Sequence, residues 1–329
     1  MISSPSVPVL GLRMRSSRVM AAMDTNETVD RVKVMMRQDS STYLCRDYLA
    51  RRITKENASP ANDSTEASEC PDVVCEDIVD AVCREKMCEW SYRVCDHFHA
   101  AREIVAISFS YLDRFIDRCS CDRTAFKLAA MTTLYMATKI FNGRQITISS
   151  LAELSRGEFE MSHIAEMEVI ILQTLGWRLH PPTVQCFINE LSPLLPSRNG
   201  LVTAAILQRA TFFAELALYD YSFVARERSL IAIAALLNAM EGMDESTISK
   251  AQQMDFLESL NKAFGLRYHF DLVEMIRNRL WYVYSMSAQY KEDDVIAPHT
   301  IKESPGKIEL GRETSSQVSQ SPVSVAHRQ

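Results

Sequence analysis

Cysteine and histidine are the side chains in this sequence that could bind a metal ion or act as nucleophiles. Three of them, Cys95, His97 and His99, lie close together in a stretch with helical spacing. Residues two apart on a helix face different directions, so we do not expect them to share a metal ion. The sequence also lacks H-E-x-x-H, G-x-S-x-G and the glycine-rich phosphate-binding motifs. We therefore expect no catalytic residues, no metal and no other cofactor.

The nine cysteines are scattered along the chain without a C-x-x-C pair. Their odd number and their place in apolar stretches predict free thiols in a reducing compartment, either nucleus or cytoplasm. The first 23 residues contain Arg13, Arg15 and Arg18 but no acid, which also fits an organellar transit peptide. A disordered tail or a later start codon explains the same residues, and we do not expect organellar targeting.

Composition and charge narrow the class of protein. Nine of the 329 residues are glycine, well below the usual share of about 7%, and residues that form helices readily are abundant. The formal net charge of −6 does not indicate a surface for nucleic acid. No uninterrupted apolar run reaches the roughly 18 residues that span a bilayer. The sequence predicts a helical protein that binds neither nucleic acid nor membrane.

Helical periodicity divides the chain into five parts. Residues 1–27 are expected to form a disordered tail, and residues 28–76 an amphipathic helix (28–53) followed by a linker rich in Ser, Thr and acids. Two groups of five helices follow at 77–180 and 181–289, and the pair Pro181-Pro182 separates them. Residues 290–329 are polar and are expected to be disordered. The predicted fold is all-α, with two five-helix units in tandem.

Capping residues predict where single helices begin and end. Asp122 is the expected N-cap of one helix, and Ser150 with Glu153 forms an expected capping box that opens another. An apolar stripe predicts the fifth helix of the first unit, which Gly176 ends. The stripe consists of Ile164, Met167, Ile171 and Leu175.

A series of short motifs between residues 84 and 177 resembles the cyclin box. In order, the motifs are Arg84-Glu85-Lys86-Met87, Leu112-Asp113-Arg114-Phe115, Met136-Ala137-Thr138-Lys139, Met167-Glu168 and Leu175-Gly176-Trp177. The resemblance covers about residues 43–285. Residues 219–223 look closest to D-type cyclins, while residues 43–49 are similar to the expanded cyclin sets of diatoms and related algae. The resemblance implies two tandem cyclin folds and a regulatory subunit that activates a cyclin-dependent serine/threonine kinase in the cell cycle.

The resemblance also assigns roles to single residues. The residues alone favour reading Arg84 and Asp113 as two unrelated surface charges, whereas the resemblance to cyclins favours an internal ion pair between them. Lys139 and Glu168 would bind backbone groups around the C-helix of the kinase, although the lysine also suits a helix end and the glutamate could simply be solvated. Trp177 would place a large aromatic ring against the kinase. Further apolar kinase contacts would come from Met136, Ile140 and Phe141.

A second group of positions matches the patch that docks Arg-x-Leu substrates in some cyclins. Its members are Cys83, Lys86, Met87, Trp90, Arg93 and Lys127. Here Lys86 replaces an apolar residue, and Arg93 and Lys127 stand where an acid and an amide are usual. Like charges disfavour a basic motif, so we predict weak or absent docking.

Three short signals lie outside the two predicted helical units. Lys55-Glu56-Asn57 in the linker resembles a degradation signal that would recruit a ubiquitin ligase, although a tripeptide also occurs by chance. Ser304 and Ser321 each precede proline and are candidate sites for phosphorylation by the partner kinase.

Two other classes of protein fit part of the pattern. A transcription-associated protein with tandem cyclin folds would share the architecture, but such proteins carry a basic DNA-facing surface and often a zinc ribbon. A helical scaffold of the repeat type would show self-similarity with a period of 34 or 40 residues. The sequence has neither feature, so a kinase-regulating cyclin is the leading hypothesis.

Overall fold

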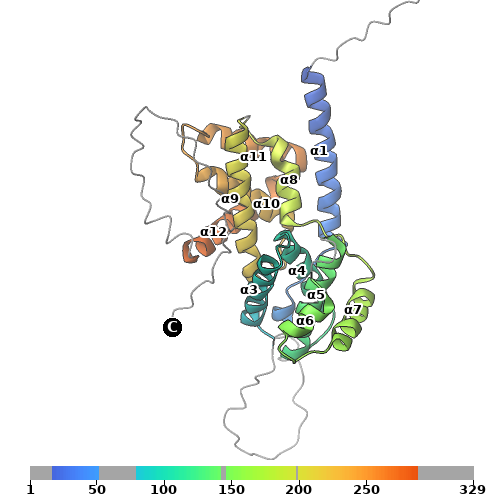
Figure 1. The fold of residues 1–329 in the computed structure, drawn as a ribbon. Coiled ribbons are helices and arrows are strands. Elements are labelled where there is room, and N and C mark those ends of the chain that lie inside the picture. The colour runs from blue at the N-terminus through green and yellow to red at the C-terminus, as the bar shows by residue number, and fades with distance from the viewer. Residues whose placement is uncertain (1–16, 52–78, 142–145, 198, 288–329) are drawn as a thin grey trace, which may run out of the picture.

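The computed structural model describes residues 17–51, 79–141, 146–197 and 199–287 (Figure 1). Within these ranges the regular secondary structure is helical and includes no strand. The all-α prediction is therefore confirmed. The candidate degradation signal Lys55-Glu56-Asn57 and the candidate phosphorylation sites Ser304 and Ser321 lie outside the described residues.

The first unit contains five helices within its described residues, as predicted. They are α3 (Ala81–His97), α4 (Glu103–Ile116), α5 (Arg123–Phe141), α6 (Ile148–Leu154) and α7 (Met161–Leu175). Every residue of α4 from Ile107 to Ile116 is buried, and α5 packs between α4 and α7. The middle of α5 is therefore buried, and its last three residues, Lys139 to Phe141, are exposed.

The second unit repeats this arrangement. Its helices are α8 (Val184–Leu191), α9 (Gly200–Tyr219), α10 (Arg228–Glu241), α11 (Lys250–Phe264) and α12 (Phe270–Met286). Helix α10 is the central one, because every residue from Ser229 to Met240 is buried and α8, α9, α11 and α12 all pack on it. Figure 1 shows the two units stacked end to end, with α9 reaching down to α3.

Helix α9 is long and apolar enough to cross a membrane by length and composition, which holds for no other helix in the described ranges. Its polar residues have partners within the protein. Arg209 donates to the carbonyl of Gly242 at 2.6 Å, and Glu215 accepts from Arg102 of α4. These contacts, together with its packing on α10, α12 and α8, hold the helix against the rest of the second unit.

Two predicted helix starts have different outcomes. Asp122 caps α5 as expected, because its Oδ1 accepts from the backbone N–H of Ala125 at 2.7 Å. The predicted start at Ser150 is wrong. Thr147 is the N-cap of α6, and its hydroxyl accepts from the N–H of Ser150 at 3.1 Å. Threonine is a preferred N-cap residue, although serine ranks above it, so the choice of Thr147 over Ser150 does not follow from capping preference alone.

The N-terminal helix also differs from its predicted bounds of 28–53. Helix α1 spans Ser17–Ser40, so residues 17–27 are helical rather than part of a disordered tail. The hydroxyls of Ser40 and Ser41 donate to carbonyls one turn back, which competes with helix continuation. A turn follows at 41–43 and a short helical stretch at 48–51.

The N-terminal segment ties the two units together. Helix α1 packs on α8, α10 and α11, and its Val32 is 1% exposed in the core of the second unit. The buried carboxylate of Asp39 accepts from Arg228 Nη1 at 2.7 Å. Tyr48, farther along, is buried in the core of the first unit. The segment therefore spans both units.

Candidate functional site

Arg84 and Asp113 form a buried ion pair between α3 and α4. Arg84 donates to the carboxylate twice, from Nε to Oδ1 at 2.8 Å and from Nη2 to Oδ2 at 2.9 Å. Tyr48 donates to Oδ1 at 3.0 Å, and Arg84 Nη1 donates to the carbonyl of Leu218 at 2.7 Å. Burial alone would lower the pKa of Arg84, but the Asp113 carboxylate outweighs it and raises that pKa. The pair thus joins α3, α4, α9 and the N-terminal segment.

Lys139 and Glu168 form a second ion pair, between the last turn of α5 and the middle of α7. The Lys139 side chain is 41% exposed and that of Glu168 is 16% exposed. Lys139 Nζ also lies 5.0 Å from the centroid of the Tyr135 ring. The structure therefore places at the surface, side by side, a three-donor ammonium and an acceptor carboxylate.

Trp177 follows α7 in a strained conformation. Gly176 and Trp177 both have positive φ, at 58° and 61°, and their N–H groups donate to the carbonyls of Gln173 and Leu172, each at 3.1 Å. This is the hydrogen-bond pattern of a Schellman cap. A left-handed backbone costs a residue with a side chain about 1 kcal/mol, yet the Trp177 side chain is 69% exposed. Its indole ring is thus held outward without a packing partner that would explain it.

Ile140 and Phe141 continue the same surface at the end of α5. Their exposed fractions are 37% and 42%, and the Phe141 ring lies 5.2 Å from the ring of His180, which follows α7. Large exposed apolar side chains that cluster in this way are typical of an interaction surface.

Met136 is the exception among the predicted contact residues. Its side chain is 0% exposed in the core of the first unit. It lies one turn before Ile140 on α5, where α4 and α7 cover the helix. Met136 therefore cannot touch a partner, and its assignment to the kinase contact is wrong.

Helix α7 contributes three exposed apolar residues that the sequence analysis missed. Met161 and Val169 are each 52% exposed, and Ile170 is 47% exposed. Met161 lies seven residues before Glu168, a spacing that places both on one side of the helix. Val169 is next to Glu168 and belongs to the run Val169-Ile170-Ile171-Leu172. Of that run, Ile171 alone lies on the predicted core stripe. The run contains more apolar residues than the core stripe needs, and this excess could have indicated an exposed apolar surface on the helix.

We call these residues the α5–α7 face. It comprises Lys139, Ile140, Phe141, Met161, Glu168, Val169 and Trp177. The face combines one hydrogen-bonding ion pair with exposed aliphatic and aromatic side chains, which is the chemistry of an interaction surface.

The residues of the predicted docking patch gather on α3 and the start of α5. Cys83, Met87 and Trp90 pack against the first core, and Lys86 is exposed. Arg93 is paired with Glu89, and Lys127 with Glu158. The two acids offset part of the positive charge of the patch, and weak Arg-x-Leu docking stays a prediction.

Metal-ligand geometry is absent from the part of the chain that the structure describes. No three His, Cys, Asp or Glu side chains there are placed to hold a metal ion.

Comparisons with known proteins agree with this architecture. The chain is 25% identical to the zebrafish G1/S-specific cyclin-D1 over 182 residues, which cover 54% of the chain and 62% of that protein. It is 29% identical to cyclin-O protein B of Xenopus laevis over 189 residues, or 55% of the chain and 52% of that protein. The alignments thus leave a large part of each relative unmatched.

A viral cyclin from herpesvirus saimiri has the same fold. Its crystal structure aligns with a TM-score of 0.53 and 20% identity, covering 63% of this chain and 88% of the viral one. A family model for the cyclin N-terminal domain matches residues 54–180, and one for the cyclin C-terminal domain matches residues 182–263. The two matches together cover more than half of the sequence, and the chain therefore belongs to the cyclin family.

Proposed function

We propose that this protein is the regulatory subunit of a cyclin-dependent serine/threonine kinase, which it binds through the α5–α7 face and activates during cell-cycle progression. The observation that carries the proposal is the Lys139–Glu168 pair at the surface with the exposed Ile140, Phe141 and Trp177 near it. Membership in the cyclin family supports the nature of the partner.

The Lys139–Glu168 pair is well suited to exchange its internal contact for contacts with a partner. An ion pair as exposed as this one contributes about 0–1 kcal/mol, so little opposes its opening. The freed ammonium would donate to carbonyls of the kinase, and the freed carboxylate would accept from its N–H groups. The apolar side chains of the face would cover the kinase C-helix between them.

Activation then follows from differential binding. A protein kinase is active when its strand lysine pairs with the glutamate of its C-helix. A partner that binds this arrangement more tightly than the inactive one shifts the population toward it. Moving the ratio from 1:99 to 99:1 requires about 5.5 kcal/mol of differential binding. The face supplies this binding energy, and the catalytic groups belong to the kinase.

A binding assay against a panel of cyclin-dependent kinases tests the proposal. In the double variant Lys139→Ala/Glu168→Ala, we expect kinase affinity to fall about 10- to 100-fold, because two groups hydrogen-bonded to the partner are lost. The matched control is Arg31→Ala/Glu190→Ala, which removes an exposed pair between α1 and α8 and leaves the affinity unchanged. Equal kinase binding by wild type and the Lys139/Glu168 variant would contradict the proposal.

Three further proposals concern regulation. We propose that the protein works in the nucleus and cytoplasm, that a ubiquitin ligase recognises Lys55-Glu56-Asn57, and that the partner kinase phosphorylates Ser304 and Ser321. The sequence motifs support these proposals. Replacing Lys55, Glu56 and Asn57 by alanine is expected to lengthen the half-life of the protein through mitosis. An unchanged half-life would exclude the degradation signal.

A further inference from the structure

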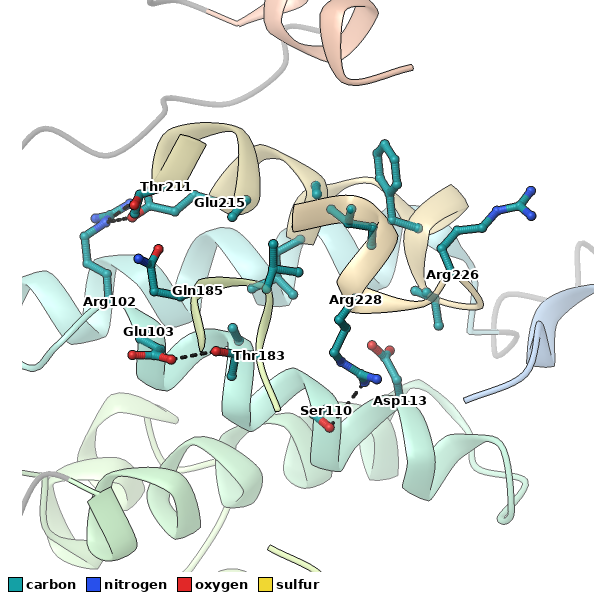
Figure 2. A pocket seen from close by; sticks show the side chains of 18 of the residues that line it. Arg102, Glu103, Ser110, Asp113, Thr183, Gln185, Thr211, Glu215, Arg226 and Arg228 are labelled. Carbon is teal, nitrogen blue, oxygen red and sulfur yellow. Dashed lines mark hydrogen bonds and ion pairs between the residues drawn. The ribbon is translucent and has the colours of Figure 1, made fainter. Parts of the chain in front are cut away.

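A cavity of about 380 Å³ lies between the two units. Its lining comes from α3, α4, α8, α9, α10 and the segment that joins the units (Figure 2). The volume is within the range of small-molecule sites. The cavity is separate from the α5–α7 face, with which it shares no residue.

One end of the cavity presents a hydrogen-bond acceptor that lacks a donor. Gln185 Oε1 is buried and has no partner in the described ranges, whereas its Nε2 donates to Asn189 at 2.9 Å. The nearby Glu103 accepts from the Thr183 hydroxyl at 2.6 Å and from the Cys186 thiol at 3.4 Å, both with Oε1. A buried acceptor without a donor is unfavourable, so this end is suited to a ligand that donates hydrogen bonds.

The same end carries an excess of negative charge. Arg102 bridges two carboxylates, those of Asp96 at 2.7 Å and Glu215 at 2.9 Å. Burial would lower the pKa of Arg102, but its hydrogen bonds to Glu215 help to raise it. Of the charged residues that line this end, Glu103 and Glu215 are acidic and Arg102 is basic, which leaves one negative charge without a matching cation. Figure 2 shows Gln185 between the Arg102–Glu215 pair and Glu103.

Apolar side chains line the middle of the cavity. They are Ala106, Val184, Ala214, Ala217, Leu218 and Ile231. At the far end, Arg228 is held by Asp39 and by Ser110 Oγ at 3.4 Å. A ligand that fits must therefore be cationic at one end and apolar along its length.

We propose that this cavity binds a guanidinium or ammonium group carried on an alkyl chain. The cation donates to Gln185 Oε1 and neutralises the charge of Glu103, since Glu215 is already paired with Arg102. The alkyl chain lies along Ala214 and Leu218. The ligand is either an arginine or lysine side chain of a polypeptide or a free small amine, since both present the same chemistry. The site couples the two units, because its acceptors come from α4, α8 and α9.

Calorimetric titration of the full chain without kinase tests this site. n-Butylguanidine is expected to bind with 1:1 stoichiometry and a Kd of about 1 mM or tighter. The neutral isostere n-butylurea has the same shape, and we expect it to bind at least about tenfold more weakly because it leaves the carboxylate charge uncompensated. Tighter binding of N-acetyl-arginine methylamide than of n-butylguanidine would identify a polypeptide source, and the reverse a free amine.

Two variants test whether n-butylguanidine binds at the proposed end of the cavity. Gln185→Leu removes the free acceptor and Glu103→Gln removes charge while keeping an oxygen for Thr183, and each is expected to weaken n-butylguanidine binding about tenfold. Glu166→Gln, on the exposed side of α7, is the control and is expected to bind like wild type. Thermal unfolding of each variant shows whether it is folded, and Glu103→Gln carries the test if Gln185→Leu does not fold. The proposal is overturned if wild type shows no saturable binding, if butylurea binds equally well, or if a folded variant at Glu103 or Gln185 binds undiminished.

Discussion

Two ion pairs join neighbouring helices in the first unit, and they differ in almost every physical respect. Arg84–Asp113 is buried, with side chains 3% and 8% exposed, and neighbouring groups satisfy the remaining donors and acceptors. Lys139–Glu168 lies at the surface, where the lysine is 41% exposed. The same attraction thus has two uses. In the interior, the ion pair holds α3, α4 and α9 together. At the surface, the ion pair keeps an ammonium and a carboxylate accessible to a partner.

Removal of one buried partner should produce the largest effect on stability. Asp113→Ala leaves the Arg84 guanidinium buried without its counter-ion, and we expect the free energy of unfolding to fall by about 3–5 kcal/mol. Chemical denaturation measures this change. Glu168→Ala, the same substitution in the exposed pair, is expected to change stability by less than about 1 kcal/mol. Equal losses of unfolding free energy in the two variants would contradict the claim that the buried pair stabilises the fold more than the exposed pair.

Replacing both buried partners by apolar residues sharpens the comparison. In Arg84→Met/Asp113→Leu no charge remains buried, so the variant should be more stable than Asp113→Ala. It still leaves the Tyr48 hydroxyl and the Leu218 carbonyl without partners, each at a cost of about 1 kcal/mol or more. We expect a loss of about 2 kcal/mol relative to wild type by the same denaturation measurement. A double variant less stable than Asp113→Ala would show that the unpaired buried charge is not the main cause of the lost stability in Asp113→Ala.

Trp177→Gly separates stability from binding at the exposed face. Glycine adopts the left-handed conformation without strain, and the indole ring buries little surface in the free protein. We therefore expect the free energy of unfolding to stay the same or rise by up to about 1 kcal/mol, while kinase affinity falls. Thermal unfolding and a kinase binding assay test the two effects. A clear loss of stability would mean that Trp177 serves the fold of the cyclin itself.

Regular patterns in the sequence were sufficient to predict the ten helices of the two units, whereas the Arg84–Asp113 pair was predicted from the resemblance to cyclins. The spacing of apolar residues indicates which side of a helix is buried, and Gly176 indicates where α7 ends. The same patterns gave wrong predictions where burial or helix bounds depend on contacts between segments that are distant in the sequence. Met136 lies in the same motif as Lys139, yet packing on both sides of α5 buries it. Helix α1 was placed too late because its packing partner is the second unit, far away in the sequence.

The cavity between the units was beyond sequence reasoning for the same reason. Gln185 and Glu103 are 82 positions apart in the sequence, and each looks like an ordinary polar residue at a helix start. The way in which α4, α8 and α9 meet creates the unpaired acceptor and the charge excess. Most residues of the α5–α7 face could be named through the resemblance to cyclins, whereas nothing in the sequence indicated a site between the units.

Reversal of the exposed pair tests the central claim most directly. Lys139→Glu/Glu168→Lys keeps an ion pair between α5 and α7, so the protein should fold with nearly unchanged stability. The donor and the acceptor now stand in each other's place, and kinase backbone groups would meet the wrong partner at both positions. We predict that the reversed protein loses most of its kinase binding and activation in a phosphorylation assay. Full activation by the folded, reversed protein would contradict the assignment of this face.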